Sequence, residues 1–120
     1  MVTVVVAHRC GVVRQALADL LNESGLFSVV GVAGARLETA LALLNCRPEV
    51  VVLGLSLTHD EQRELSLMAR CSSPSARVLV LSHRGGRFYV RDSFRGTPEA
   101  PLSSENMGAA LVDAMVKLAT

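Results

Sequence analysis

The chain has 120 residues, enough for one domain with its own hydrophobic core and too few for two. Half of the residues are apolar and the formal net charge is +1, without a basic stripe, which argues against a strong nucleic-acid-binding surface. The three cysteines are widely spaced, which suits reduced thiols in a cytoplasm. The sequence has no signal-peptide pattern and no apolar stretch long enough to span a bilayer. We therefore predict a cytoplasmic domain without a membrane partner.

The first half of the sequence alternates short apolar runs with segments in which apolar residues recur at helical spacing. A first strand is predicted at 2–7, and the helix after it ends at Gly25. A second strand at 27–32 precedes a short helix that ends near Pro48, because proline restricts the residue before it. The third strand lies within 50–56.

The second half continues the alternation with weaker signals. A third helix is predicted at 60–70 and a fourth strand at 77–82. A marginal fourth helix at 87–94 comes next, followed by a short edge strand around Pro98. The last helix is predicted at 104–118, where apolar residues again recur every three or four positions.

Alternating strands and helices predict an α/β fold, a parallel sheet covered by helices on both faces. Right-handed crossovers give the strand order 2-1-3-4-5, with the functional crevice at the carboxyl ends of the first and third strands. The loops expected at that crevice contain His8, Arg9, Cys10, Gly54, Ser56, His59, Ser82, His83 and Arg84.

The run Val50–Ser56 resembles the third strand of response-regulator receiver domains, and the resemblance, closest to the NarL/LuxR type, extends along the whole chain. It implies one receiver-like domain over 1–120 with the flavodoxin-like (βα)5 fold. In that family the third strand carries the aspartate that accepts phosphate, where this chain has Gly54. Two acidic metal ligands follow the first strand in the family, where this chain has His8 and Arg9.

The remaining family positions are also changed, apart from one hydroxyl. Ser82 matches the residue that contacts the phosphate. Ala100 aligns with the family's lysine and Thr97 with its aromatic switch residue, and the family's proline after the lysine predicts a cis peptide bond before Pro101. An acyl phosphate requires a carboxylate nucleophile and a metal ion, so we expect no catalytic residue, no metal ligand and no magnesium cofactor.

Several roles for the altered crevice remain open. We favour Arg9 as a structural substitute for magnesium, bonded to loop carbonyls or to Ser82. Alternatively, an anionic or small organic effector could be bound by Arg9, Ser56, His83 and Arg84. The three histidines and Cys10 could instead hold zinc, although their spacing matches no zinc motif. Cys10 beside a cation could be redox-active, and Asp60 could replace the missing phosphate acceptor.

The resemblance implies the regulatory and dimerisation domain of an atypical orphan response regulator that controls transcription without phosphorylation, for example of antibiotic biosynthesis. Relatives associate as homodimers through the first and last helices, or through the fourth helix, fifth strand and fifth helix. They contact DNA through a C-terminal helix-turn-helix domain, which this chain lacks. The alternative is a sensor of a metabolite. An enzyme using His8 or His83 as a base is remote, because no motif pairs either with a nucleophile.

Overall fold

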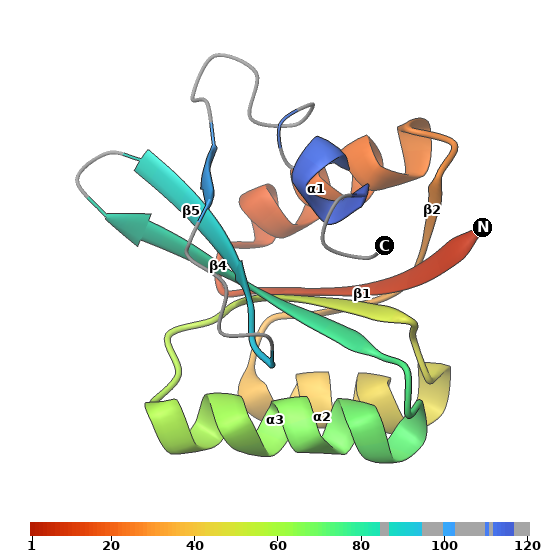
Figure 1. Cartoon of the computed structure of the whole chain (residues 1–120), viewed down its shortest axis with the longest axis vertical. Coiled ribbons are helices and arrows are strands. Elements are labelled where there is room, and N and C mark those ends of the chain that lie inside the picture. Colours follow the sequence, from red (N-terminus) through yellow and green to blue (C-terminus); the bar gives the residue numbers. More distant parts are fainter. Residues whose placement is uncertain (85–86, 95–99, 103–109, 111, 117–120) are drawn as a thin grey trace.

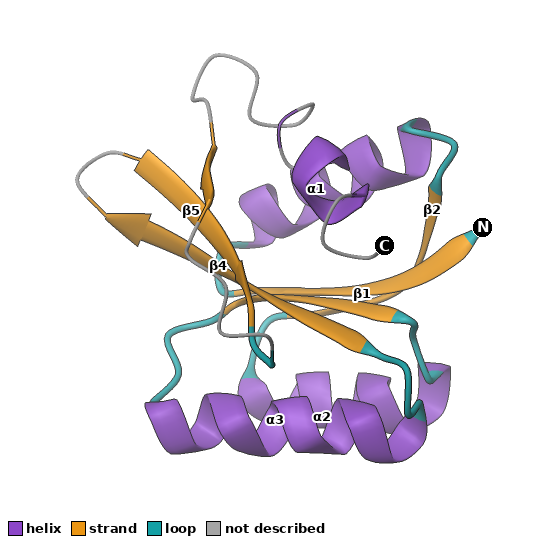
Figure 2. Cartoon of the chain, viewed as in Figure 1, coloured by secondary structure: helices purple, strands orange, loops and turns teal. Residues whose placement is uncertain are grey.

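The computed structural model describes residues 1–84, 87–94, 100–102, 110 and 112–116. They form one six-stranded sheet, of order β2-β1-β3-β4-β5-β6, with helices on both faces (Figures 1 and 2). The elements are β1 Val2–His8, α1 Gly11–Glu23, β2 Phe27–Ala33, α2 Arg36–Cys46, β3 Val50–Gly54, α3 His59–Ser72, β4 Arg77–Arg84, β5 Arg87–Asp92 and β6 Ala100–Leu102.

Two core clusters form because both faces of the central strands are covered. Alternate residues of a strand point to opposite faces, so Val50 and Val52 pack beneath α1 while Val51 and Leu53 pack above α2 and α3. Met115, from the helical residues 112–116, joins the α1 side (Figure 1). This double burial explains why the strands appear in the sequence as unbroken apolar runs.

The first four strands confirm the predicted α/β, flavodoxin-like arrangement. Strand β1 pairs in parallel with β2 and β3, and β3 pairs in parallel with β4. The helix boundaries also agree closely, since α1 ends just before Gly25, which has a φ of 75°, and α2 ends just before Arg47. The carboxyl ends of β1 and β3 meet directly, with His8 paired to Gly54.

The predicted fourth helix at 87–94 is wrong, because β5 occupies 87–92 and runs antiparallel to β4. Phe88, Tyr89 and Val90 are residue types that favour strands. Burial along β5 alternates with the period of a strand, as Val90 and Asp92 are buried while Arg91 between them is half-buried. The predicted order 2-1-3-4-5 therefore holds for the five predicted strands, of which β6 is the fifth, and the antiparallel β5 is an additional strand between β4 and β6.

Strand β6 corresponds to the predicted edge strand, but it pairs antiparallel with β5. The described part of the chain contains no cis peptide bond, so the expected cis bond before Pro101 is not found. Of the predicted last helix, residues 110 and 112–116 are helical, and the rest lies outside the described residues. No helix in the described ranges has the length and apolar character needed to cross a bilayer.

Candidate functional site

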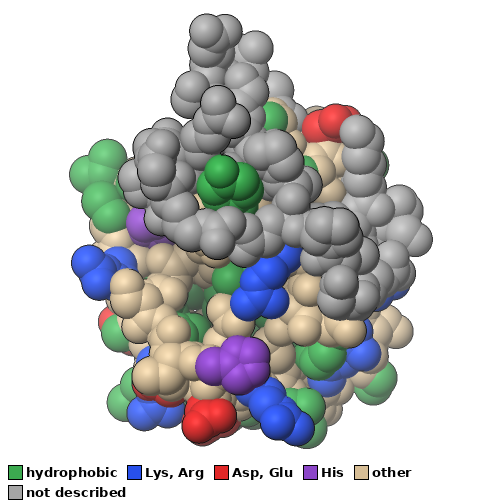
Figure 3. Space-filling model, turned by 60° about the vertical axis from the view of Figure 1, so that its left-hand side comes forward, with side chains coloured by type: hydrophobic (Ala, Val, Ile, Leu, Met, Phe, Trp, Pro, Cys, Tyr) green, Lys and Arg blue, Asp and Glu red, His purple; other side chains and the backbone are tan. Residues whose placement is uncertain are grey.

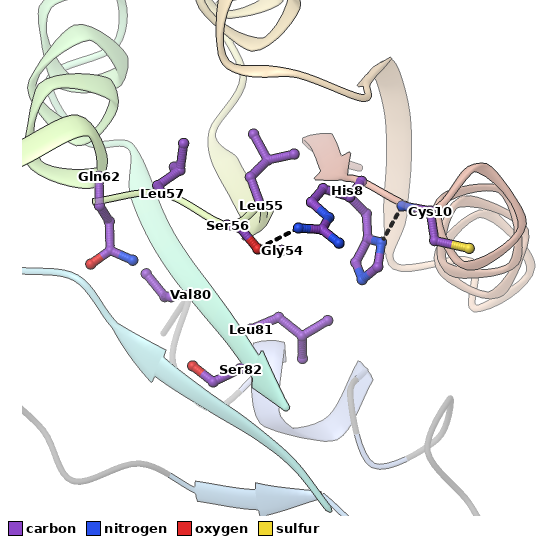
Figure 4. A pocket seen from close by; sticks show the side chains of 11 residues that line it. His8, Cys10, Gly54, Leu55, Ser56, Leu57, Gln62, Val80, Leu81 and Ser82 are labelled. Atoms are coloured by element: carbon purple, nitrogen blue, oxygen red, sulfur yellow. Dashed lines mark hydrogen bonds between the residues drawn. The ribbon is translucent and has the colours of Figure 1, made fainter. Parts of the chain in front are cut away.

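A cavity of about 590 Å³ opens at the carboxyl ends of β1, β3 and β4 (Figure 4). It brings together six of the nine residues expected there, which come from three separate loops or strand ends. We call this cavity the crevice. It is lined by His8, Arg9, Cys10, Gly54, Leu55, Ser56, Leu57, Gln62, Val80, Leu81 and Ser82.

The imidazole of His8 occupies the space where a side chain at position 54 would stand. A β-carbon built on Gly54 would lie 2.5 Å from Cδ2 of His8. The ring is held in this orientation because its Nδ1 accepts a hydrogen bond of 3.0 Å from the backbone N–H of Cys10 (Figure 4). Glycine at position 54 is thus the residue that allows the His8 ring to fill the base of the crevice.

The arrangement also shifts the pKa of His8. Its burial lowers the pKa of the imidazole below the ordinary value, and repulsion from the Arg14 and Arg9 guanidiniums lowers it further. The net lowering of the pKa favours a neutral imidazole, whose Nδ1 can accept the Cys10 hydrogen bond.

Arg9 joins two loops across the crevice. Its Nη1 donates a hydrogen bond of 2.9 Å to Oγ of Ser56, which links the loop after β1 to the loop after β3 (Figure 4). The sequence analysis anticipated a bond to loop carbonyls or to Ser82, whereas the observed partner is Ser56. The crevice thus presents a guanidinium and an imidazole, and neither is the oxygen ligand that magnesium prefers.

Arg14 and Gln62 belong to the site but were missed from the sequence. Arg14, in the first turns of α1, donates a hydrogen bond of 3.0 Å from Nη1 to the carbonyl oxygen of His8. A β-carbon on Gly34 would collide with the Arg14 guanidinium, so this glycine after β2 was the available signal. Gln62 lies on the first turns of α3 and accepts a hydrogen bond of 2.6 Å from Arg91.

No family model matches this chain, and no curated protein sequence matches it. Among solved structures, the response regulator domain of Thermotoga maritima CheB superposes with a TM-score of 0.66 at 14% sequence identity, covering 99% of this chain and 96% of that chain. The chain has the receiver fold. At this level of identity, the likeness establishes the receiver fold and carries no activity with it.

The remaining predicted residues either do not line the crevice or lie outside the described part. Ala100 lies in β6, which pairs with β5, so a strand that the prediction did not include separates it from Ser82 on β4. His83 and Arg84 are the last residues of β4, and their side chains lie outside the described part. Thr97 also lies outside the described residues. Asp60 is exposed in the first turn of α3 and does not line the crevice.

The remaining chemistry of the crevice concerns metal ions and Cys10. Among the described residues, no three His, Cys, Asp or Glu side chains are grouped so that they could hold a metal ion. Cys10 is an exposed free thiol at the start of α1. The backbone N–H groups of Val13 and Val12 at the start of α1 lower the pKa of its thiol.

Proposed function

We propose that this chain is the phosphorylation-independent regulatory and dimerisation domain of an atypical orphan response regulator that controls transcription. The observation that carries the proposal is the placement of His8 against Gly54. In the family that the sequence resembles, position 54 would hold the phosphate-accepting carboxylate. Here the position has no side chain, and the space beside it is filled by an imidazole.

The charge around the crevice supports the same proposal. Transfer of a phosphoryl group to a carboxylate requires a metal ion to neutralise the charge that develops on the oxygens. Arg9 and Arg14 place two positive charges near His8, and the described residues that line the crevice include no Asp or Glu. A divalent cation would be repelled from this site rather than held there.

A regulator of this kind acts through association rather than through chemistry. We place the homodimer interface on a groove of about 540 Å³ between α1 and the helical residues 112–116, lined by Leu20, Leu26, Val112 and Val116 together with Glu23, Ser24 and Asp113. A two-fold axis would bring this surface against its own copy. The alternative face predicted from the sequence included a fourth helix, and that segment is strand β5. DNA contact would come from a helix-turn-helix domain outside this chain.

Incubation with magnesium and a small phosphodonor such as acetyl phosphate tests the proposal. Intact-mass spectrometry of the wild-type chain should show no phosphoryl adduct. The triple variant His8→Asp/Arg9→Asp/Gly54→Asp, which restores the carboxylates of the family, is the reference for a competent pocket. A base-labile phosphoryl adduct on the wild-type chain would contradict the proposal.

A second candidate is a sensor that binds a small metabolite in the crevice. The volume of the crevice falls within the range of about 300–1,000 Å³ that ligand pockets occupy, and Arg9 suits an anionic group. Such a ligand would act by binding one association state more tightly than the other. Thermal shift measurements with candidate pathway products, on the wild-type chain and Arg9→Gln, test this role. An unchanged melting temperature across the panel would count against it.

A further inference from the structure

A second cavity, of about 400 Å³, lies between α3 and the segment formed by β5 and the two residues after it. We call it the α3–β5 pocket. Its polar lining is contributed by His59, Gln62, Arg63 and Ser66 from α3, and by Arg91 and Ser93 from the other side. Figure 3 shows a hollow on one face of the molecule with blue arginine and purple histidine side chains around it.

The pocket follows from the replacement of the expected fourth helix by a strand. Alternate residues of β5 face opposite sides of the sheet. Val90 and Asp92 are buried, and Val90 packs in the core beneath α1. Arg91 and Ser93 have the opposite orientation and reach the side chains of α3. Among the described residues, β5 follows β4 along the chain without a helix between them.

The charge of the pocket differs from that of the chain. The whole chain is nearly balanced, with 12 Lys and Arg against 11 Asp and Glu. The described residues that line the pocket nevertheless include Arg63, Arg91 and His59 and no carboxylate. The two ion pairs found among the described residues join Glu61 and Glu64 of α3 to Arg36 of α2, and so neutralise neither arginine of the pocket.

The arginine on β5 is oriented before any ligand arrives. Its Nη2 donates a hydrogen bond of 2.6 Å to Oε1 of Gln62, which fixes one edge of the guanidinium. Two further hydrogen bonds involve the buried Ser66. Its Oγ lies 3.0 Å from Oγ of Ser93 and donates a hydrogen bond of 2.8 Å to the backbone carbonyl of Gln62. The planar guanidinium of Arg91 has further N–H donors beyond the one used, and these can pair with two oxygens of one anion.

We propose that the α3–β5 pocket binds a small phosphorylated molecule, with its phosphate held by Arg91 and Arg63. Two guanidiniums and the neighbouring His59 match the several acceptor oxygens and the double charge of a phosphate group. Leu67 and Phe94 supply the apolar part of the lining, against which the remainder of the molecule packs. Gln62 lines this pocket and the crevice, so the two cavities adjoin, but the site requires neither Arg9 nor the proposed function of the crevice.

Isothermal titration calorimetry with inorganic pyrophosphate, orthophosphate and AMP, at fixed ionic strength, tests the site on the whole chain. Wild type should bind pyrophosphate saturably, and Arg91→Gln should weaken that binding by about tenfold or more, as loss of a charged hydrogen bond does. Arg63→Gln should weaken it to a smaller extent. Tighter binding of AMP than of orthophosphate would identify an organic phosphate as the ligand. Equal binding of the two would show that the site recognises the phosphate group alone. Either result supports the site.

The matched control is Arg47→Gln, which removes the same charge from an exposed position after α2. Its affinity for pyrophosphate should stay within about twofold of wild type, because charges outside a site are screened by salt. Arg91→Lys keeps the charge but loses the planar fork, and should bind less tightly than wild type while remaining folded by circular dichroism. The proposal is overturned if no probe binds saturably, if Arg47→Gln weakens binding as much as Arg91→Gln, or if only Arg9→Gln abolishes binding.

Discussion

At the scale of single residues, His8 and Gly54 form a steric pair. Gly54 does not have a positive φ, so its backbone alone would tolerate a side chain. The constraint comes from the imidazole across the strand pair, whose Cδ2 would lie 2.5 Å from an added β-carbon. Gly54 and His8 are therefore linked, because the imidazole leaves no room for a side chain at position 54.

Gly54→Ala should lower the free energy of unfolding by about 1–3 kcal/mol, the usual cost of overpacking a filled space. Urea denaturation measures the change. Gly11→Ala is the control, because a β-carbon at Gly11 would stand 3.4 Å from the nearest Arg14 atom, which is an ordinary contact, and alanine favours a helix.

The pairing itself is tested by a double-mutant cycle. In the His8→Ala background the ring is gone, so Gly54→Ala should cost less than it does in the wild-type chain. Equal costs in the two backgrounds would show that His8 does not create the constraint.

The same histidine predicts a dependence of stability on pH. Burial and the Arg14 and Arg9 charges lower the pKa of His8 in the folded chain, so the unfolded chain binds the proton more tightly. The free energy of unfolding should therefore decrease as pH falls below about 6.5, the ordinary imidazole value, toward the lowered pKa of the folded state. Urea denaturation across this range measures the slope.

His8→Asn should flatten that slope, since the Asn carbonyl can accept the Cys10 hydrogen bond without titrating. His59→Asn, at an exposed position, is the matched control and should keep the wild-type slope. If the slopes of both variants equal that of wild type, another group causes the pH dependence.

At this scale the sequence predicted which residues line the crevice better than it predicted the hydrogen bonds between them. His8, Arg9 and Ser56 could be placed together because the carboxyl ends of parallel strands share one edge of a sheet. The hydrogen bond from Arg9 to Ser56 could not be predicted, because Arg9 had several acceptors within reach. Gln62 was missed because its role depends on Arg91, which the sequence analysis had placed on a helix.

At the scale of elements, α3 supplies one wall of both cavities, so the position of its first turn matters. Thr58 caps the helix, since its Oγ accepts a hydrogen bond from the N–H of Glu61 while the Glu61 carboxylate accepts one from the N–H of Thr58. The sequence analysis placed the start of this helix at Asp60, two residues too late for the reciprocal Thr58–Glu61 pair. The cap fixes where Gln62 emerges beside the crevice.

Thr58→Ala should destabilise the chain by about 1 kcal/mol, because two backbone donors at the start of α3 lose their ordered partners. Thermal and urea denaturation measure the loss. Ser75→Ala, at an exposed position in the turn before β4, should be neutral within about 0.5 kcal/mol. A neutral result for Thr58→Ala would indicate that tertiary packing alone fixes the helix start.

Strand β5 shows where element prediction failed and why. Gly85 and Gly86 precede the segment that starts at Arg87, and this segment is short enough to form either a marginal helix or a strand. Expectation of a repeated strand–helix alternation favoured the helix, although Phe88, Tyr89 and Val90 favour a strand. Pairing with β4 over six residues decides the outcome, because that pairing satisfies the backbone hydrogen bonds of the segment.

At the scale of the whole molecule, the fold was predictable as far as β4 because the core determines it. Strands buried on both faces have apolar residues at every position, as in β3, and this pattern admits few alternatives in a chain of this length. In β5, only alternate residues of 89–92 are buried, and the apolar pattern is weaker. The sequence predicts the binding surface least well. Exposed leucines lie on α1, on α2 and in the loop before β2, and the sequence alone does not say which of them contacts a partner.

The proposed homodimer assigns one of these surfaces, and Leu26→Glu tests it. Leu26 is 52% exposed and lines the groove beside residues 112–116, so a charge there would be buried against its own copy across a two-fold axis. Sedimentation over a concentration series should show a dimer dissociation constant at least about tenfold higher than that of wild type, the weakening expected for an unpaired buried charge.

Leu44→Glu is the control, because Leu44 is 53% exposed but lies on α2, on the opposite face of the sheet. It introduces the same charge at a matched exposure and should leave the dissociation constant unchanged. If Leu44→Glu disrupts the dimer and Leu26→Glu does not, the interface lies on the α2 face, and α1 with the C-terminal helical residues is excluded as the contact surface.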